Sequence, residues 1–266
     1  MKIQKINENI YRFTISYKDI YTTVYTVKFD TGYLVFDAAS YDEDIDNYVV
    51  PMLTELGITR ENLKYVFISH NHRDHAGGLS RLLDFYPGVT VISRSPALAE
   101  AFPETKFISP EDMQKIENCF TVVAIPGHTL DSSALYDERT KTLITGDSLQ
   151  LFGIFGSEDW GANIALPTEH LEAVEKLRGM DIESIYAAHD YHPYGYAYVG
   201  REAVENALDA ASRPLLTMKK MIENNPDKTD AEIREMYNSS AHIPPVRERV
   251  FHAVRELLKT KVGQEK

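Results

Sequence analysis

A short segment in the first half of the chain concentrates side chains that can bind metal ions or move protons. Residues 69–78 read SHNHRDHAGG and place His70, His72, Asp74 and His75 within six residues, directly after an apolar run. Alternate side chains at the end of an extended strand share one face, so His70 and His72 can point the same way. The following turn can bring the other two nearby. Imidazole and carboxylate both bind borderline divalent cations, so the spacing predicts a pair of metal ions.

Three later segments each add one candidate ligand. His128 lies in AIPGHTLDSS, Asp147 in LITGDSL and His189 in IYAAHDYH, and each follows a short apolar run. Residues at the ends of neighbouring strands gather along one edge of a sheet, where loops are free to bind ligands. Together with the first segment they make seven candidate ligands, five histidines and two aspartates.

The order of these motifs carries a family resemblance. HNHRDH resembles the His-x-His-x-Asp-His motif of the metallo-β-lactamase superfamily, and PGHT, GD and the late histidine follow in that family's order, over roughly residues 10 to 190. The resemblance implies an α/β (α+β) fold, a four-layer αββα sandwich with its active site at one edge of the sheets. It also implies how the ligands divide: one metal is bound by His70, His72 and His128, the other by Asp74, His75 and His189, and Asp147 bridges the two.

Such a centre predicts hydrolysis. Two divalent cations, two aspartates and a bridging hydroxide leave a net positive charge, which favours an oxyanion. Metal coordination lowers the pKa of water to about 7, so the bridging hydroxide can attack without a serine or cysteine nucleophile. Asp74 is the candidate catalytic residue, because it can hold or relay the proton that the leaving group needs. The cofactors expected are two divalent ions, zinc first, with iron or manganese as alternatives.

Asp147 narrows the reaction class. True β-lactamases that resemble this fold place other residues at the bridging position, so the chain looks more like the glyoxalase II, lactonase, phosphodiesterase and nuclease branches. We predict a hydrolase of a small ester, thioester or lactone. Three alternatives stay open: a phosphodiesterase, an iron-dependent sulfur dioxygenase of the same superfamily, and a non-catalytic module in which metals only fix loops.

The substrate contacts are predicted from aromatic residues near the later ligands. Phe155 and Trp160 are interleaved with glycines in 149–163, a composition suited to a loop that covers a site; the alternative is that they anchor the loop on the core. Tyr194 can offer a phenol to an oxyanion, although ordinary packing is the alternative for the tyrosines that follow His189.

Composition limits the partners. The 266 residues include 28 Lys or Arg and 40 Asp or Glu, for a net charge of −12, which argues against nucleic acid as a partner. The single cysteine, Cys119, excludes a Cys-rich zinc cluster, and no run approaches the length of a membrane span. We expect a cytoplasmic protein with a small-molecule substrate, no membrane partner and a possible homodimer.

The secondary structure expected from residue patterns has two parts. Residues 1–200 form the catalytic domain, which begins with an antiparallel meander and continues as alternating strands and helices. Its expected strands include 10–16, 21–29, 33–39, 63–70 and 182–188, the last strand predicted; its expected helices include 40–58 and 75–86.

Residues 201–266 form a helical extension. Pro214 is expected to divide or kink its first helix, and Thr229 with Glu232 fits a capping box for a short second helix. The extension either covers the mouth of the active site or makes a dimer interface.

Overall fold

The computed structural model describes residues 3–193, 195–240 and 244–264. The strands are β1 (Gln4–Lys5), β2 (Ile10–Tyr17), β3 (Ile20–Phe29), β4 (Gly32–Phe36), β5 (Leu63–Phe67), β6 (Thr90–Ile92), β7 (Phe107–Ile108), β8 (Gln114–Ile116), β9 (Phe120–Ala124), β10 (Ser133–Asp137), β11 (Thr142–Ile144), β12 (Ser184–Tyr191) and β13 (Gly195–Val199). The helices are α1 (Asp42–Asp44), the π-helical turn η1 (Ile45–Val49), α2 (Val50–Glu55), α3 (Arg73–Ala76), α4 (Leu79–Phe85), α5 (Pro96–Ala101), α6 (Pro167–Arg178), α7 (Arg201–Asn224), α8 (Asp230–Ser240) and α9 (Glu248–Gln264).

The strands belong to two sheets. One has the order β1-β2-β3-β4-β5-β6-β7, and the other has the order β13-β12-β11-β10-β9-β8. The chain divides into two compact units: unit 1 runs up to Ala124 and includes Ser133–Leu135, and unit 2 comprises Ile125–Ser132 and the residues from Tyr136 onward. Among the residues that the structure describes, no helix combines the length and apolarity needed to cross a membrane.

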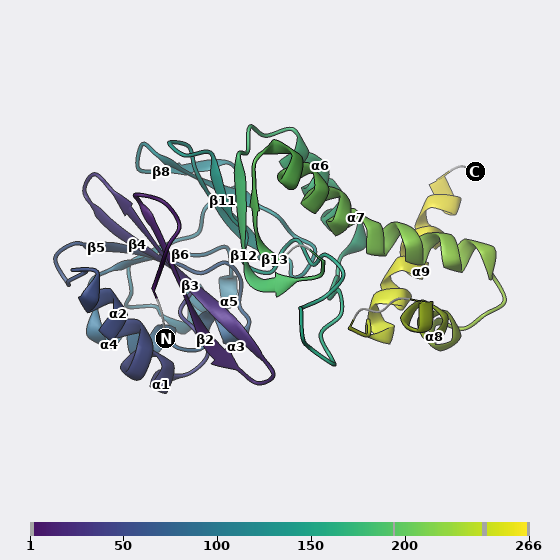
Figure 1. Cartoon of the computed structure of the whole chain (residues 1–266), viewed down its shortest axis with the longest axis horizontal. Coiled ribbons are helices and arrows are strands. Elements are labelled where there is room, and N and C mark those ends of the chain that lie inside the picture. The colour runs from purple at the N-terminus through teal and green to yellow at the C-terminus, as the bar shows by residue number, and fades with distance from the viewer. Residues whose placement is uncertain (1–2, 194, 241–243, 265–266) are drawn as a thin grey trace. The chain divides into compact units, whose positions relative to one another are not determined.

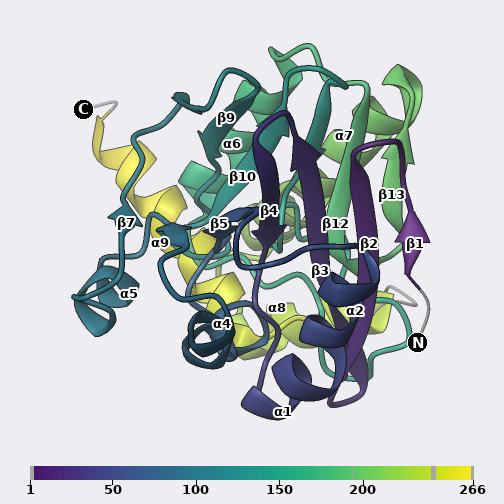
Figure 2. The same cartoon turned by 90° about the vertical axis from the view of Figure 1, so that its left-hand side faces the viewer.

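Unit 1 contains the seven-stranded sheet, which is antiparallel from β1 to β4 and parallel from β4 to β7. Alternate apolar residues of its strands are buried on one face, in a core that also contains apolar residues of η1, α2 and α4 (Figure 2). On other strand positions Phe36 stacks on Phe67, with ring centroids 5.0 Å apart, and Phe29 meets Phe120 of β9 edge-on at 5.4 Å. Burial on both faces explains the continuous apolar run YLVF of β4.

The parallel pair β4–β5 positions the first group of candidate ligands. The two strands are in register at Phe36 and Phe67, so the residues that follow both strands leave the sheet at the same edge. Asp37 follows β4 and donates its backbone N–H to the carbonyl of Phe67 at 2.8 Å. The segment 69–78 follows β5 and contains the short helix α3, which is labelled in Figure 1.

In unit 2 a second parallel pair positions two more candidate ligands. Strands β11 and β12 are in register at Ile144 and Tyr186, and β12 pairs antiparallel with β13. The pairing continues past the end of β11, because the N–H of Ala188 donates to the carbonyl of Gly146 at 3.2 Å. Gly146 has a φ of 56°, which a glycine adopts without strain. The turn at this glycine therefore sets Asp147 beside His189.

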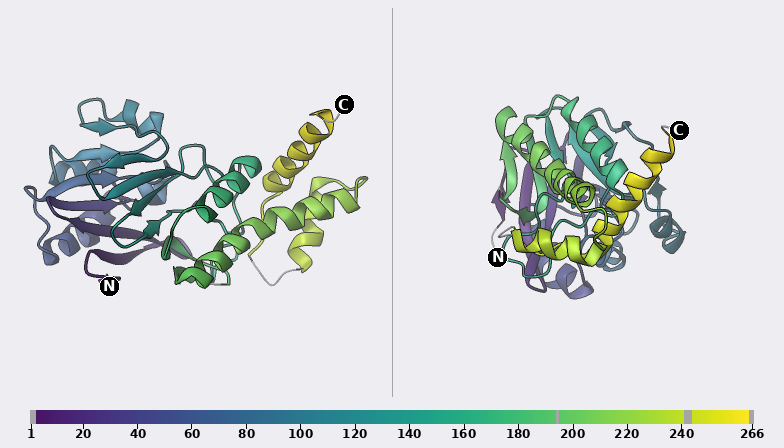
Figure 3. Two further views of the ribbon diagram at one scale, coloured as in Figure 1. Left: turned by 90° about the horizontal axis from the view of Figure 1, so that it is seen from above. Right: turned by 90° about the vertical axis from the view of Figure 1, so that its right-hand side faces the viewer.

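The three C-terminal helices of unit 2 pack on one another (Figure 3). Their core is made of apolar residues at helical spacing, namely Leu215, Met218, Ile222, Ile233, Tyr237, Val246, Val250, Phe251 and Val254. The predicted capping box is confirmed: Glu232 Oε2 accepts the Thr229 N–H at 2.8 Å, and Thr229 Oγ1 accepts the Glu232 N–H at 3.3 Å.

The structure differs from the sequence expectations at several elements. Helix α7 runs without interruption through Pro214, so that residue does not divide it. Residues 182–188 are not the last strand, because β13 follows; its tyrosine-rich sequence is half-exposed and lacks the long apolar run that marked the other strands. The expected helix 40–58 contains a π-helical turn, and Gly77 and Gly78 separate 75–86 into α3 and α4. The division at residue 200 stays a prediction.

Candidate metal centre

The first group of candidate ligands lies on a loop held close to the rest of unit 1 by two glycines. A Cβ on Gly77 would lie 2.1 Å from the carbonyl oxygen of Ser40, and one on Gly78 would lie 2.5 Å from that of Ala38. The N–H groups of both glycines donate to carbonyls of this neighbouring segment. The glycines in HRDHAGG are therefore required for close packing, and that packing fixes α3, which carries Asp74 and His75.

Asp37 organises this loop, and sequence reasoning missed it. Its Oδ1 accepts the Ser69 N–H at 2.8 Å, while its Oδ2 lies 3.0 Å from the Ser69 hydroxyl and 2.7 Å from His75 Nδ1. Burial raises the pKa of the Asp37 carboxyl, and the interactions with His75 and Ser69 oppose that shift. The missed signal was available: Asp37 directly follows the apolar run YLVF, and Asp147 follows LIT after one glycine.

These contacts determine which ring nitrogens of His75 and His70 can bind a cation. A carboxylate accepts hydrogen bonds, so Asp37 places the His75 proton on Nδ1 and leaves a lone pair on Nε2. The Ser69 hydroxyl gives its proton to Asp37, so its oxygen accepts from His70 Nδ1, 3.0 Å away. The lone pair of His70 is then also on Nε2, which lies 3.0 Å from His72 Nδ1.

Asp74 lies beside the same group. Its Oδ2 is 3.5 Å from His75 Nε2, and its backbone carbonyl accepts the Thr22 hydroxyl at 2.6 Å. His70 and His75 are buried, whereas His72 and Asp74 are partly exposed. Unit 1 thus brings together all four ligands that were predicted from the contiguous motif.

Unit 2 brings together the three ligands that were predicted from separate segments. The carboxylate of Asp147 lies between two histidines: Oδ1 is 3.0 Å from His189 Nε2, and Oδ2 is 3.6 Å from His128 Nε2. All three side chains are buried. A buried carboxylate with one oxygen toward each imidazole has the donor geometry of a residue that can serve two cations.

His128 is oriented by the chain around it. Its Nδ1 lies 2.8 Å from the backbone carbonyl of Asn163. A carbonyl only accepts, so Nδ1 carries the proton and Nε2 keeps its lone pair on the side of Asp147. The preceding Gly127 has a φ of 150°, and a Cβ there would lie 2.7 Å from His170 Cβ. The glycine of PGHT therefore lets the turn approach α6.

The residues present fit divalent cations. In the described part of the chain, His and Asp side chains form groups that could hold metal ions. Three of the histidines have Nδ1 occupied by an oxygen partner, so each offers Nε2 as a neutral donor: His70, His75 and His128. Outer partners of this kind normally accompany metal-binding histidines. The donors are nitrogen and carboxylate oxygen, which suit zinc, iron and manganese alike.

The predicted substrate contacts lie on the loop after Asp147 and around β12. Phe155 is 55% exposed and stacks on His192 with ring centroids 4.0 Å apart. Trp160 faces the guanidinium of Arg247 at 5.1 Å. The prediction for Tyr194 lies outside the described residues. Tyr191, which was considered with the other tyrosines, instead contacts a ligand: its hydroxyl is 3.2 Å from Asp147 Oδ1.

His170 is a histidine without a predicted role, and the structure gives it a different environment from the ligands. It is buried in α6, with Nε2 3.0 Å from the carbonyl of Ala211. Burial lowers its pKa from 6.5 to about 4. It therefore stays neutral near pH 7 and serves as a matched reference for the candidate ligands.

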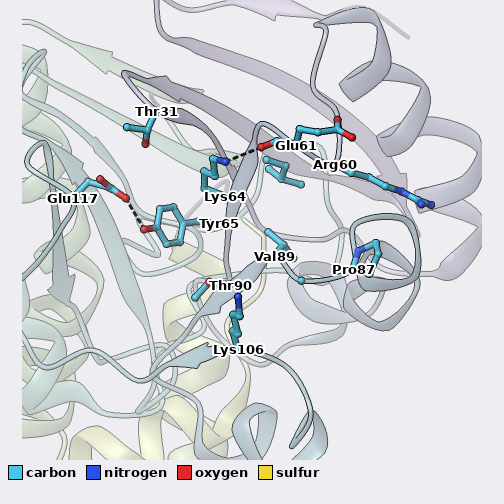
Figure 4. Close-up of a pocket in the computed structure, with 12 residues that line it drawn as sticks. Thr31, Arg60, Glu61, Lys64, Tyr65, Pro87, Val89, Thr90, Lys106 and Glu117 are labelled. Carbon is cyan, nitrogen blue, oxygen red and sulfur yellow. Dashed lines mark hydrogen bonds between the residues drawn. The ribbon is translucent and has the colours of Figure 1, made fainter.

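Unit 1 also contains a cavity of about 450 Å³ away from the ligand loop (Figure 4). It opens at the start of β5 and β6, whereas the ligands follow the other end of β5. Its polar lining contains both charges, since it includes Lys64, Lys106 and Glu117. The Glu117 carboxylate accepts a hydrogen bond from the Tyr65 hydroxyl at 2.6 Å. None of the predicted ligands lines this cavity.

Comparison with family models and curated proteins places the motif in context. Residues 18–189 match the family described as the metallo-beta-lactamase superfamily. The chain is 30% identical over 156 residues to a hydroxyacylglutathione hydrolase of Thermosynechococcus vestitus, covering 58% of this chain and 59% of that one. It is 32% identical over 154 residues to a hydroxyacylglutathione hydrolase of Photobacterium profundum, covering 56% of each. The chain thus spans less than two thirds of the length of these relatives.

Solved structures show the same fold. A metallo-beta-lactamase family protein from Thermus thermophilus superposes with a TM-score of 0.69 at 17% identity, covering 97% of this chain and 95% of that one. A metallo-beta-lactamase from Pontibacter korlensis has a TM-score of 0.59 at 18% identity, covering 79% and 98%. The predicted fold class, mixed α/β with two sheets, is confirmed.

Proposed function

Because the chain belongs to the metallo-beta-lactamase superfamily, we propose that it is a metal-dependent hydrolase of a small ester, thioester or lactone. The observation that carries the proposal is the placement of Asp147 between His128 and His189, with one carboxylate oxygen toward each ring. This residue can neutralise part of the charge of two cations at once. Its position supports a two-metal hydrolytic site rather than a single structural ion.

We propose two ligand sets, one for each ion. One ion would be bound by His70, His72 and His128. The other would be bound by Asp74, His75 and His189, and Asp147 would be shared by both ions. Zinc is the first candidate, because neutral imidazole and carboxylate donors are common around it. Iron and manganese fit the same donors.

Bound divalent ions would supply Lewis-acid polarisation and lower the pKa of water to about 7. The chain's own residues prepare for this chemistry. Asp37 and the Asn163 carbonyl fix the protons of His75 and His128 on Nδ1, so Nε2 of each ring faces the ligand group. Asp74 holds a carboxylate next to His75, where it can take a proton released in the reaction.

A thioester is the substrate we favour within this class. The curated relatives are named as hydrolases of hydroxyacylglutathione, an acyl thioester. In its hydrolysis water adds to the acyl carbon, the C–S bond breaks, and the thiol leaves. A thiol has a pKa of about 8.5, so its departure near neutral pH needs little help from an acid. A leaving group of this kind suits the proposed site, because Asp74 is also a proposed metal ligand and is therefore a weaker acid catalyst.

The test is a substrate panel on the protein as purified, after chelation and after reloading with zinc. The panel comprises a hydroxyacyl thioester of glutathione, a lactone, a β-lactam and bis(4-nitrophenyl) phosphate. We expect the thioester to be hydrolysed, the activity to be lost on chelation and to return with zinc. His72→Ala should abolish it, whereas His170→Gln, a change at a buried histidine outside the ligand sets, should keep it. Hydrolysis that survives chelation would contradict the proposal.

The same panel, together with measurements of oxygen consumption and metal content, separates the three alternative functions. Phosphodiester cleavage without thioester cleavage would assign the phosphodiesterase class. Consumption of oxygen with one iron per chain would assign a sulfur dioxygenase. Two tightly held ions with no activity on any substrate would favour a module in which metals only fix loops.

Size-exclusion chromatography with light scattering tests the proposed homodimer, and fractionation of the source cells tests the proposed cytoplasmic location.

A further inference from the structure

A buried hydrogen-bond network behind the unit 2 ligands centres on Gln150. The side chain is 2% exposed, and its backbone adopts a φ of 45°, an uncommon conformation for a non-glycine residue. Its Oε1 lies 2.7 Å from the backbone N of Asn163, and its Nε2 lies 2.9 Å from the carbonyl of Asp147 and 3.3 Å from the hydroxyl of Tyr191.

The direction of each hydrogen bond in this network follows from its first member. The backbone N–H of Asn163 can only donate, so the amide oxygen of Gln150 faces it and the amide nitrogen faces Asp147 and Tyr191. The carbonyl of Asp147 can only accept, in agreement with this orientation. Since Gln150 donates to the Tyr191 hydroxyl, the Tyr191 proton is directed to Asp147 Oδ1 at 3.2 Å.

The network reaches both sides of the unit 2 ligand group. On one side Tyr191 donates to the carboxylate of Asp147. On the other, the same Asn163 whose N–H binds Gln150 accepts His128 Nδ1 through its carbonyl at 2.8 Å. One glutamine side chain is therefore linked, directly or through one neighbour, both to Asp147 and to the residue whose carbonyl accepts from His128 Nδ1.

We propose that Gln150 is a positioning residue for the unit 2 ligands, which couples Asp147, through Tyr191, to His128, through Asn163. The inference rests on the proposed function, because it gives these residues a metal to serve. The Tyr191 hydroxyl donates its proton to Asp147 Oδ1, and this hydrogen bond holds the carboxylate in one orientation before any cation binds. Loss of an outer partner of a metal ligand typically weakens binding by about 10- to 100-fold.

The experiment compares Gln150→Met, which keeps side-chain length but removes every hydrogen bond, with Tyr191→Phe and with the double variant. Apo-protein of each is titrated with zinc, and the cobalt(II) form is examined by visible absorption, which reports ligand geometry without turnover. We expect Gln150→Met and Tyr191→Phe each to weaken the affinity for zinc by about 10- to 100-fold and to change the cobalt spectrum. The double variant should lose less than the product of the two, because Gln150 acts partly through Tyr191.

Controls separate positioning from folding and from the proposed function. Gln114→Met makes the same substitution at an exposed site in unit 1, where Gln114 Oε1 accepts the Glu111 N–H at 2.9 Å, and should change neither zinc affinity nor the cobalt spectrum. Gln150→Glu keeps the acceptor for Asn163 but sets a carboxylate oxygen against the carbonyl of Asp147, so it should not restore the wild-type affinity or spectrum. Wild-type affinity and spectrum in both Gln150→Met and Tyr191→Phe, or independent losses that multiply in the double variant, would overturn the inference. If the wild type itself binds no metal, the proposed function fails instead.

Discussion

The two groups of candidate ligands are built in opposite ways. In unit 1 four ligands come from six consecutive residues, and a single carboxylate, Asp37, orients the group through Ser69 and His75. In unit 2 three candidate ligands come from three distant segments, and hydrogen bonds through Gln150 link two of them, Asp147 and His128. In the contiguous motif one carboxylate orients the side chains and glycine packing holds the backbone, whereas the dispersed candidate ligands are linked by a hydrogen-bond network. The difference predicts how each group responds to change.

The largest effect is expected at Asp147, the one residue that contacts both histidines of the unit 2 group. Asp147→Asn removes the charge that His128 and His189 share while keeping the shape of the side chain. We expect thioester hydrolysis and the affinity for the weaker zinc ion to fall by more than about 100-fold, beyond the loss typical of an outer partner. Steady-state kinetics and zinc titration measure it, with the exposed Asp227→Asn as control. Retained zinc binding would show that unit 1 alone holds the metals.

Asp37→Asn tests the single anchor of unit 1. An amide cannot accept from both Ser69 and His75 as the carboxylate does, so we expect metal affinity to fall about 10- to 100-fold and the free energy of unfolding of the apo-protein to fall by about 1–3 kcal/mol. Zinc titration and urea unfolding measure the two quantities, with the exposed Asp42→Asn as reference. If the loss is much smaller than that of Gln150→Met, the contrast between one anchor and a network is wrong.

Gly77→Ala tests the packing that holds the unit 1 loop. The new Cβ would meet the Ser40 carbonyl at 2.1 Å, so the backbone must shift, and we expect a loss of about 1–3 kcal/mol in the free energy of unfolding together with weaker metal binding. Gly179→Ala in unit 2 is the matched control, since its Cβ would be no closer than 3.4 Å to a neighbour. Equal unfolding curves for the two variants would remove the packing role of Gly77.

His170 sharpens the contrast between a ligand and a structural histidine. Its pKa of about 4 in the folded protein lies below the ordinary 6.5, so the unfolded chain takes up the proton first as pH falls. Its contribution to stability is complete above pH 6.5 and is lost progressively toward pH 4; between about pH 7 and 5 the loss is about 2 kcal/mol. Urea unfolding of apo wild type and His170→Gln at both pH values measures it. An identical pH dependence in both proteins would contradict the assignment.

The smallest effect is expected in the C-terminal helices, away from both ligand groups in sequence. Thr229→Ala breaks the capping box with Glu232 and should lower the free energy of unfolding by about 1 kcal/mol without changing the affinity for zinc. Thr54→Ala, at an exposed helix position, is the control. A change in zinc affinity would mean that this region takes part in the site.

The sequence was most informative where chemistry is contiguous. Residues 69–78 indicate four candidate ligands by their spacing, and the strands β2 and β3 were predicted close to their observed bounds. Asp37 and Gln150 were not recognised, because their roles depend on which strands and turns lie next to one another. Gln150 has ordinary neighbours in sequence, and its partners Asn163 and Tyr191 are 13 and 41 residues away.

The elements that were predicted wrongly share a physical cause. Pro214 lies inside α7 because the buried residues around it, such as Leu208, Leu215 and Met218, bind the helix to its neighbours more strongly than the proline disrupts it. Strand β13 was missed because only one of its five residues is buried, so its pattern is weak and its pairing with β12 determines it.

X-ray absorption at the zinc edge of the loaded protein tests most directly whether the two ligand groups serve one two-metal centre. The proposal predicts about two zinc ions per chain, an average shell of imidazole nitrogen and carboxylate oxygen, and a zinc–zinc distance of about 3.5–4 Å that disappears in both His72→Ala and His189→Ala. Two ions without a zinc–zinc distance, or a spectrum unchanged when either histidine is replaced, would contradict it.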